Sequence, residues 1–451
     1  RQSGVLSAVG SLMLVQYLAA LLWQYETAVP ISLSTAVFDL FYALVFGLPF
    51  VLDRLLFKRL TLAMRLLLLP SAMVAGEFII ATFSPLGISY GIRAITQSEN
   101  LALLQLISIT GPYGIAFLIG LLATIINHAW EQSSWSILKK YGGAFAVGLL
   151  LIMAFGQARL SFFKPQPGAQ HVTIAGITPE INQRNSASDS MSGASFPPSE
   201  SELARTRTSE AMSVYASVQD ELLDATQQAA DAGADLVMWA ETAAPSIAEN
   251  REQFLDKVSR MASENEVFVN VAIGVPFVSN ETHLISPQGS TLWTYYKNHP
   301  VPVLEPVAAV KGEVPVISTP YGRISNVICF DADFPALSRV NADIMMVPGW
   351  EWPGMGYTHT VKMARLRAIE NGYSLIRMSY SGHSAAFDYL GNIIASQDTS
   401  QPGEPHIVFA DMPTRGSRTI YNRIGDVFAW LCILAVFAAF YLSFRSKTSQ
   451  S

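Results

Sequence analysis

The sequence predicts a multi-pass α-helical membrane domain joined to a layered α/β domain. The first observation is composition: 50% of the 451 residues are hydrophobic and only 14% are charged, against about 25% in an average soluble domain. The second is that long apolar runs lie towards the two ends of the chain. The third is a middle section in which short β-branched runs alternate with helix-like segments, the pattern of an α/β fold.

The composition also excludes several classes of protein. A mean hydropathy of +0.31 is too high for a disordered, collagen-like or disulfide-stapled chain. The net charge of −6 argues against a nucleic-acid partner, since such proteins usually carry a basic face. The only cysteines, Cys329 and Cys432, make no disulfide framework. Because the seven histidines lack metal-ligand spacing and no phosphate-binding glycine loop occurs, we expect neither a metal nor a cofactor.

Apolar runs of about 20 residues can cross a bilayer. The candidates are Leu6–Tyr25, Ile31–Leu52, Leu62–Phe83, Gly114–Asn127 with an apolar flank from Leu101, Gly143–Phe155 and Val427–Phe444. The Gly114 and Gly143 runs are shorter, so re-entrant or buried core helices are their alternative. We expect about five spans in residues 1–160 and a last one in residues 424–445. Because the chain begins with Arg1 rather than Met, we also expect residues upstream of it.

Basic residues in short loops indicate the cytoplasmic side of a membrane. They follow the second, fourth and last runs, as Arg54, Lys58, Arg59, Lys139, Lys140, Arg445 and Lys447, whereas the alternate loops hold only Arg93. With six spans, all the basic loops share one side. The α/β domain, residues 168–414, is therefore predicted to be extracytoplasmic and tethered at both ends.

Within the α/β domain, periodicity predicts the elements in order. The β-branched runs that predict strands are Val172–Ile177, Leu236–Trp239, Val267–Val275, Val327–Phe330 and Ile344–Val347. The segments with helical patterning are Ser209–Ala232, Gln253–Glu264 and Thr360–Asn371. The Ser- and Pro-rich stretch 183–202 shows no periodicity and is predicted to be a mobile surface loop.

Three reactive residues follow or end predicted strands: Glu241 in VMWAET, Lys297 in YYKNH and Cys329 in ICFD. Such residues project into the crevice where α/β sheets bind ligands. An acid, a base and a thiol suffice for covalent acyl transfer. Glu241 would take the thiol proton, Cys329 would attack a carbonyl carbon, and Lys297 would stabilise the thiolate and then the oxyanion.

Each of these residues also has an ordinary structural interpretation. A lone cysteine in a strand is commonly an inert core residue, and a Glu after a strand or a Lys such as Lys297 is commonly solvated. Their order and flanking residues together favour catalysis. His299 lies two residues after Lys297 and faces the same way in an extended segment, so we expect it to form supporting hydrogen bonds rather than act as a base.

Candidate pocket residues lie elsewhere in the chain. Asp39 and Glu77 fall inside predicted spans, where ionisable groups are costly and often functional; the alternative is a position near a helix end or a bond to a neighbouring helix. Trp350 and Trp352, in a Pro- and Gly-rich stretch after a strand, either line a substrate pocket or pack as core aromatics. Trp239 is a further candidate for the pocket.

The three residues in their contexts WAET, YxKxH and ICFD resemble the nitrilase (carbon-nitrogen hydrolase) superfamily, which carries a Glu-Lys-Cys triad on an α-β-β-α sandwich. Among membrane-embedded members, the chain resembles the apolipoprotein N-acyltransferase family, in which transmembrane helices precede and follow a periplasmic nitrilase domain. Further similar segments are EFI at 77–79, residues 103–119, residues 359–372 and TIYNRIGD at 419–426.

The resemblance implies a function and its partners. Cys329 would accept an acyl group from a phospholipid donor, and the thioester would pass it to the amine of the N-terminal cysteine of a diacylglyceryl-modified apolipoprotein. It also implies a multi-pass protein of the bacterial cytoplasmic (inner) membrane that acts at the lipid bilayer. Glu305 matches a second glutamate of the family's site, Phe330 and Asp331 stand where the family has Tyr and Glu, and Glu77 matches a family position.

The departures from the family favour a second interpretation. HPVPVLE at 299–305 replaces HLVPFGE, VPGWEWPG at 347–354 replaces an Asn-Asp-Ala-Trp run, and only 31 residues separate Lys297 from Cys329. In the family, a longer insertion there forms an arm over the lipid entrance. The second interpretation is a membrane-tethered amidase or related C–N hydrolase, with water as the acceptor. A third is a catalytically inactive binding or scaffold module on a membrane anchor.

Overall fold

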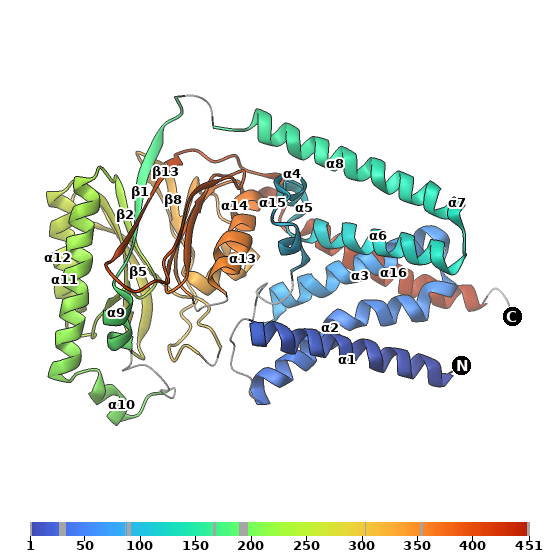
Figure 1. The fold of residues 1–451 in the computed structure, drawn as a ribbon, viewed down its shortest axis with the longest axis horizontal. Coiled ribbons are helices and arrows are strands. Elements are labelled where there is room, and N and C mark those ends of the chain that lie inside the picture. The colour runs from blue at the N-terminus through green and yellow to red at the C-terminus, as the bar shows by residue number, and fades with distance from the viewer. Residues whose placement is uncertain are drawn as a thin grey trace. The chain divides into compact units, whose positions relative to one another are not determined.

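The computed structural model describes residues 2–26, 33–85, 87, 92–165, 168–188, 197–302, 304–351 and 355–448. The chain divides into two compact units (Figure 1). The helical unit comprises residues 1–162 and 423–451, and the α/β unit comprises residues 163–422. The sequence predicted 168–414 for the α/β domain.

Long helices make up the helical unit. They are α1 (Gln2–Glu26), α2 (Leu33–Leu56), α3 (Leu62–Phe83), α6 (Tyr113–Glu131), α8 (Gly143–Phe162) and α16 (Val427–Thr448). Short helical segments join them: η1 (Phe57–Arg59), η2 (Arg93–Gln97), α4 (Leu101–Leu104), α5 (Ile107–Thr110), α7 (Trp135–Ile137) and η3 (Leu138–Gly142). In the described residues, five helical stretches are long and apolar enough to cross a membrane: Thr35–Arg59, Leu62–Phe83, Tyr113–Glu131, Trp135–Phe162 and Val427–Arg445.

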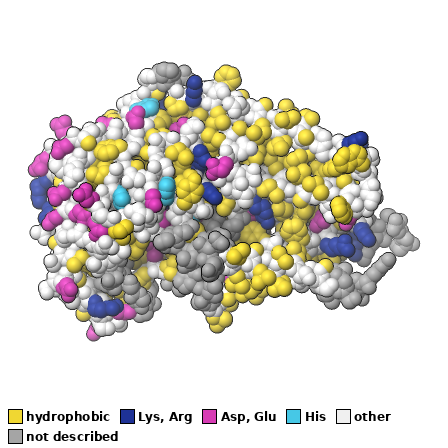
Figure 2. All heavy atoms as spheres, viewed as in Figure 1, with side chains coloured by type: hydrophobic (Ala, Val, Ile, Leu, Met, Phe, Trp, Pro, Cys, Tyr) yellow, Lys and Arg dark blue, Asp and Glu magenta, His cyan; other side chains and the backbone are white. Residues whose placement is uncertain are grey.

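The two shorter apolar runs belong to full-length helices. Tyr113–Glu131 extends the Gly114 run, and Trp135–Phe162 extends the Gly143 run to 28 residues. Leu150 and Leu151 on α8 are 68% and 67% exposed, which suits contact with lipid rather than a place in a core. Hydrophobic side chains cover much of the helical unit's surface in Figure 2. The apolar flank from Leu101 is separate, because it forms the short helices α4 and α5.

Two sheets form the centre of the α/β unit (Figure 1). The first contains β1 (His171–Thr178), β2 (Leu236–Trp239), β3 (Ala244–Pro245), β4 (Phe268–Val275), β5 (Ser279–Ile285), β6 (Thr291–Tyr296) and β13 (His406–Pro413), in the order β13-β1-β2-β4-β5-β6 with β3 beside β4. The second, in the order β12-β11-β10-β9-β8-β7, contains β7 (Val316–Thr319), β8 (Gly322–Asn326), β9 (Ile344–Trp350), β10 (Ser374–Tyr380), β11 (His383–Phe387) and β12 (Ile393–Asp398). The central pairs β1–β2–β4 and β8–β9–β10 are parallel.

Helices cover both outer faces of the paired sheets. They are α11 (Ser209–Asp231) and α12 (Arg251–Glu264) on the first sheet, and η5 (Thr358–Ala364) and α14 (Arg365–Asn371) on the second. The other helical segments of this part of the chain are α9 (Ile181–Ser188), α10 (Glu200–Arg205) and α13 (Pro335–Ser338). Val172, Met238 and Met346, from both sheets, share the core between the sheets. Val218 of α11 packs in a second core against the first sheet, and Ala368 of α14 packs in a third against the second sheet. This is the predicted α-β-β-α sandwich. Helix α15 (Ile420–Ile424) follows it at the sequence boundary between the units.

The structure corrects two local predictions. The stretch 183–202 was predicted as a loop, but its described ends are helical, in α9 and α10; residues 189–196 lie outside the described residues. Ser199 and Glu202 form a capping box that starts α10, which explains helix there despite the polar sequence. A strand was predicted at Val327–Phe330, but β8 ends at Asn326 and Cys329 begins the 3₁₀ turn η4 (Cys329–Asp333).

Candidate active site

Glu241 lies just beyond the carboxyl end of β2. The Ala240 backbone N–H donates to the Ile177 carbonyl at 2.9 Å, and the Glu241 N–H donates to Gly349 O of the facing sheet at 3.3 Å. The chain therefore leaves its own sheet at this point and is held by the other. Thr242 follows with a φ of +47°, a conformation that non-glycine residues rarely adopt. Glu241 is 2% exposed, so its carboxylate is committed to partners inside the protein.

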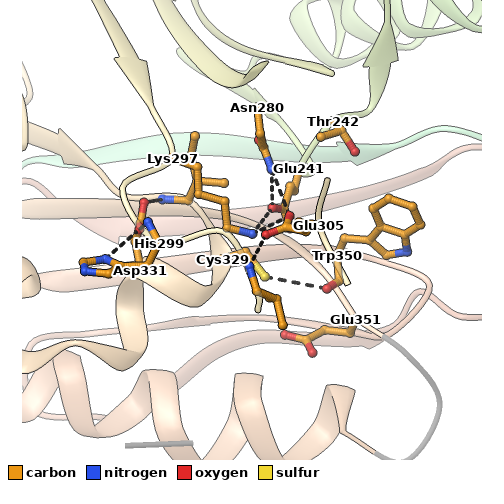
Figure 3. Close-up of polar contacts among 12 residues, drawn as sticks. Glu241, Thr242, Asn280, Lys297, His299, Glu305, Cys329, Asp331, Trp350 and Glu351 are labelled. Atoms are coloured by element: carbon orange, nitrogen blue, oxygen red, sulfur yellow. Dashed lines mark hydrogen bonds and ion pairs between the residues drawn. The ribbon is translucent and has the colours of Figure 1, made fainter. Parts of the chain in front are cut away.

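Lys297 supplies the cation at the centre of the site (Figure 3). It directly follows β6, and its N–H donates to Asn280 O of β5 at 2.9 Å. Its Nζ donates to Glu241 Oε1 and to Glu305 Oε1, both at 2.7 Å. Asn280 Nδ2 donates to the same two oxygens, at 2.7 and 3.3 Å. We call Glu241, Asn280, Lys297 and Glu305 the lysine cluster.

Burial and charge act against each other within the lysine cluster. Burial alone would lower the pKa of Lys297, but the carboxylates of Glu241 and Glu305 raise that pKa well above its usual value. Burial raises the pKa of Glu305, and the charge of Glu241 acts in the same direction, while Lys297 opposes both. The lysine is therefore a fixed positive charge.

Cys329 stands at a strained turn after β8. Its φ of +47° turns the chain sharply from the strand into η4. Its Sγ donates to Trp350 O at 3.6 Å and accepts from Arg377 Nη2 at 3.4 Å. Burial raises the pKa of the thiol well above its usual value, and the charge of Glu241 adds to this increase, while Lys297 and Arg377 oppose it. The resting sulfur is therefore a thiol.

Asp331 connects the turn at Cys329 to the segment that carries Lys297. Its carboxylate accepts from Tyr295 OH at 2.8 Å and from the backbone N–H of His299 at 2.8 Å. Weaker bonds come from the N–H groups of Asn298 and Ile328, both at 3.3 Å. Asp331 is buried and does not contact the sulfur, so it positions the turn rather than taking part in the chemistry.

The predicted supporting residues His299 and Phe330 both pack against Phe334. His299 Nδ1 lies 3.2 Å from Asp331 Oδ1, and its ring stacks on Phe334 at 3.7 Å between centroids. Phe330 packs edge-on against the same Phe334 ring at 5.4 Å. Glu305, by contrast, contacts the lysine directly.

Trp239 and Trp350, two predicted pocket residues of the α/β unit, have different surroundings. Trp239 is fully buried on the α11 side of its sheet, and its Nε1 donates to Thr226 Oγ1 at 3.0 Å, so the expectation that it lines the pocket is wrong. Trp350 contributes its carbonyl to the site, and its ring packs against Tyr380 at 5.7 Å. Trp352 lies outside the described residues. Glu77 belongs to α3 of the helical unit, where it forms an ion pair with Arg93 Nη1 at 2.7 Å.

Sequence reasoning missed several polar residues of the site, namely Asn280, Glu351, His359 and Arg377. Asn280 is buried in a strand, where an unpaired amide would be costly, and that was the available signal. Arg377 in the run SLIRMSY offered the same signal, since an arginine in an apolar strand needs a partner. Among the described residues, no group of three or more His, Cys, Asp or Glu side chains could hold a metal ion.

Comparisons with known proteins cover both units. The profile of the carbon-nitrogen hydrolases matches residues 215–419, and that of the apolipoprotein N-acyltransferase N-terminal domain matches residues 3–125. The apolipoprotein N-acyltransferase of Geobacter metallireducens is 26% identical over 404 residues, which cover 80% of this chain and 71% of that protein. The Bradyrhizobium diazoefficiens protein of the same name is 27% identical over 444 residues, which cover 87% and 76%.

A solved amidase from Nesterenkonia sp. is 18% identical, with a TM-score of 0.44 over 58% of this chain and 96% of that one. The two profiles match in the same order as the two kinds of structure, apolar helices first and the sandwich after them. Residues 215–419 are therefore similar to the carbon-nitrogen hydrolases, and over most of its length the chain is similar to the apolipoprotein N-acyltransferases.

Proposed function

We propose that this chain is a bacterial membrane-bound N-acyltransferase with Glu241, Lys297 and Cys329 as its catalytic residues. It takes a fatty acyl group from the sn-1 position of a phospholipid, holds it on Cys329 and passes it to the N-terminal cysteine amine of a diacylglyceryl-modified lipoprotein. The observation that carries the proposal is the lysine cluster beside a buried thiol, in a chain whose apolar helices precede and follow the α/β unit in sequence. The names of its relatives support it.

The first half-reaction replaces an oxygen ester with a thioester. Glu241 takes the proton of Cys329 as Sγ attacks the ester carbonyl carbon. The carbonyl oxygen becomes an oxyanion, which Lys297 stabilises because its Nζ is already fixed in the cluster. The C–O bond then breaks, and the leaving alkoxide recovers the proton from Glu241. The products are a lysophospholipid and the acyl-Cys329 thioester.

The second half-reaction forms an amide. The lipoprotein amine attacks the thioester carbon, and Glu241 accepts a proton from the nitrogen. The C–S bond then breaks, and the sulfur of Cys329 regains the proton. Glu305 supports both steps, because it shares Lys297 with Glu241 and keeps the ammonium in place when the charge on Glu241 is neutralised.

The proposal includes the cytoplasmic membrane as location and an extracytoplasmic α/β unit. Lys and Arg after α2, after α6 and in the last turn of α16 support this orientation, since these ends share one side if six helices cross the bilayer. A phospholipid donor is also most accessible to an enzyme that is tethered in the bilayer.

An extracytoplasmic amidase is the second candidate. The observation in its favour is the closed environment of the reacting groups, since Cys329 is 7% and Lys297 2% exposed. Water reaches a buried thioester more easily than a lipoprotein does. The same Cys329 chemistry would then release ammonia or an amine from an amide, followed by hydrolysis of the thioester.

The test is the intact mass of the detergent-purified protein after incubation with mixed phospholipids. We expect the wild type to gain one fatty acyl group that hydroxylamine removes. Cys329→Ser and Glu241→Ala should stay unmodified, whereas Cys432→Ser, which changes the other cysteine, should gain the group. Adding a diacylglyceryl-cysteine peptide should then return the enzyme to its original mass and acylate the peptide. An unmodified wild type with every lipid, together with ammonia release from small amides, would establish the amidase instead.

A further inference from the structure

Arg377 of β10 contacts the sulfur of Cys329 through its guanidinium group. Its Nη2 donates to Cys329 Sγ at 3.4 Å, and its Nη1 donates to Cys329 O at 3.2 Å. The guanidinium is therefore bound both to the sulfur and to the carbonyl of the residue at the strained turn. Arg377 is 2% exposed, so solvent does little to screen its charge.

Arg377 also forms an ion pair with Glu351, which is itself paired with His359. Glu351 directly follows β9, and its Oε1 accepts a short hydrogen bond from the same Arg377 Nη2. The other carboxylate oxygen, Oε2, lies 2.9 Å from His359 Nδ1, and Asp333 Oδ2 lies 3.8 Å from His359 Nε2. A chain of alternating charges thus runs away from Cys329, in the order Arg377, Glu351, His359 and Asp333.

Glycines leave room for this chain of charges. A Cβ at Gly349 would lie 3.3 Å from Arg377 Cζ, and a Cβ at Gly382 would lie 2.6 Å from Glu351 Cβ. The backbone at Gly349 of β9 and at Gly382, in the turn between β10 and β11, therefore lies close to the side chains of Arg377 and Glu351.

We propose that Arg377 is a second cationic partner of the Cys329 sulfur beside Lys297, and that Glu351 limits how strongly this charge favours the thiolate. The inference rests on the proposed function in one respect only, namely that Cys329 is the nucleophile. In the proposed reaction Lys297 stabilises the oxyanion as well as the sulfur, whereas the bonds of Arg377 go to Cys329 and Glu351. Arg377 therefore acts on the nucleophile, and Lys297 on both the nucleophile and the oxyanion.

The charges around the sulfur determine whether each substitution raises or lowers the pKa of Cys329. Two cations, Lys297 and Arg377, and two carboxylates, Glu241 and Glu351, act on the pKa of Cys329. The cations lower this pKa, and the carboxylates raise it. His359 partly neutralises the charge of Glu351, because it pairs with Oε2, the carboxylate oxygen that Arg377 does not bind. Removing Arg377 should therefore make the thiol less acidic, and removing the charge of Glu351 should make it more acidic.

The test measures the alkylation rate of Cys329 by iodoacetamide as a function of pH, with the modified peptide quantified by mass spectrometry. Cys432, buried in α16, provides an internal reference in the same sample. We expect Arg377→Gln to slow alkylation at neutral pH roughly tenfold, one unit of apparent pKa. Glu351→Gln, which keeps a hydrogen-bonding side chain, should accelerate it by about the same factor. Arg377→Lys should lie between Arg377→Gln and the wild type.

Opposite signs distinguish this proposal from structural damage, since a distorted site would change both variants in one direction. Arg323→Gln is the matched control, because it removes a guanidinium paired with Asp343 at 2.8 Å on β8, away from the sulfur. Its Cys329 profile should equal that of the wild type. An unchanged profile for Arg377→Gln, or slower alkylation of Glu351→Gln, would overturn the proposal. Alkylation needs no acyl donor, so a failure of phospholipid transfer leaves this result standing, and the two failures are distinguishable.

Discussion

Replacing Lys297 by Met should destabilise the α/β unit as well as abolish its chemistry. Its side chain is 2% exposed, and Nζ lies 2.7 Å from one oxygen of Glu241 and of Glu305. The methionine leaves these two carboxylates facing each other without a cation. Removing one partner of a buried ion pair costs about 3–5 kcal/mol of unfolding free energy. For a domain of this size class, the cost corresponds to a decrease of about 6–20 °C in the unfolding midpoint.

The pH dependence of this loss has a definite sign. Lys297 opposes the increase in the pKa of Glu305 that burial and Glu241 cause, so its removal raises that pKa further. In the variant, folded Glu305 then binds a proton at a pH where the unfolded chain does not. Stability therefore rises as pH falls. The deficit relative to wild type should therefore shrink as pH falls towards the usual pKa of a glutamate, about 4.5.

The assay is thermal unfolding in detergent, followed by tryptophan fluorescence at one scan rate. Lys257→Met is the matched control, because Lys257 lies 3.9 Å from Asp220 with 45% of its side chain exposed. Such surface pairs contribute at most about 1 kcal/mol. The double variant Lys297→Met/Glu305→Gln should recover much of the stability and still form no thioester. A Lys297→Met protein that melts with the wild type at every pH would refute the reasoning.

Three further predictions concern single contacts. Asn280→Ala removes the amide that bridges the carboxylates of Glu241 and Glu305. Thioester formation, measured by single-turnover mass spectrometry, should slow by about 10- to 100-fold, and the unfolding free energy, measured by melting, should fall by about 1–3 kcal/mol. Trp239→Phe loses the hydrogen bond to Thr226 and the part of the buried indole that a phenyl ring does not fill, so it should cost roughly 2–4 kcal/mol and leave the thioester rate unchanged; a slower rate would return Trp239 to the site. Burial would raise the pKa of Glu351, but His359 and Arg377 lower it to about 2. The ionised Glu351 should therefore stabilise the folded protein above about pH 4.5, and this stabilisation should disappear as pH falls to about 2. The melting profile of Glu351→Gln should lack this loss.

Local periodicity correctly predicted the helices and strands whose buried residues recur with the period of the element. The helix expected at Ser209–Ala232 is α11 at Ser209–Asp231, because its apolar positions recur with the helical period and Thr208 caps its first turn. The run Leu236–Trp239 is β2 as expected. Such segments form the same helix or strand whenever one face packs against a core. Their secondary structure can therefore be predicted from a single sequence.

The failed predictions depend on backbone geometry that apolar patterning does not contain. Val327 and Ile328 are apolar because they are buried, yet the strand has ended before them, since Cys329 adopts a φ of +47°. Trp239 lies two residues before Glu241, which in a continuous strand would place both side chains on one face. The strand ends at Trp239, however, so its side chain remains under α11 while Glu241 turns into the site.

The charged surroundings of the sulfur depend on tertiary register. Arg377 is 48 residues from Cys329 in sequence and reaches it because β10 pairs in parallel with β9, with Arg377 opposite Val347. A shift of one residue would turn the guanidinium to the other face of the sheet. The sequence indicates that an arginine buried in a strand needs a charged partner. Which carboxylate of the domain becomes that partner depends on how the strands pair.

The balance of charge indicates when Cys329 can lose its proton. Two cations lie among three carboxylates, and these five groups are Lys297, Arg377, Glu241, Glu305 and Glu351. With all five ionised the group already carries one net negative charge, so a resting thiolate would add a second in a buried site. The thiol instead donates to Trp350 O. A preformed thiolate is thus disfavoured. In the proposed reaction, proton transfer would therefore accompany attack, when the new negative charge moves from the sulfur to a carbonyl oxygen beside Lys297.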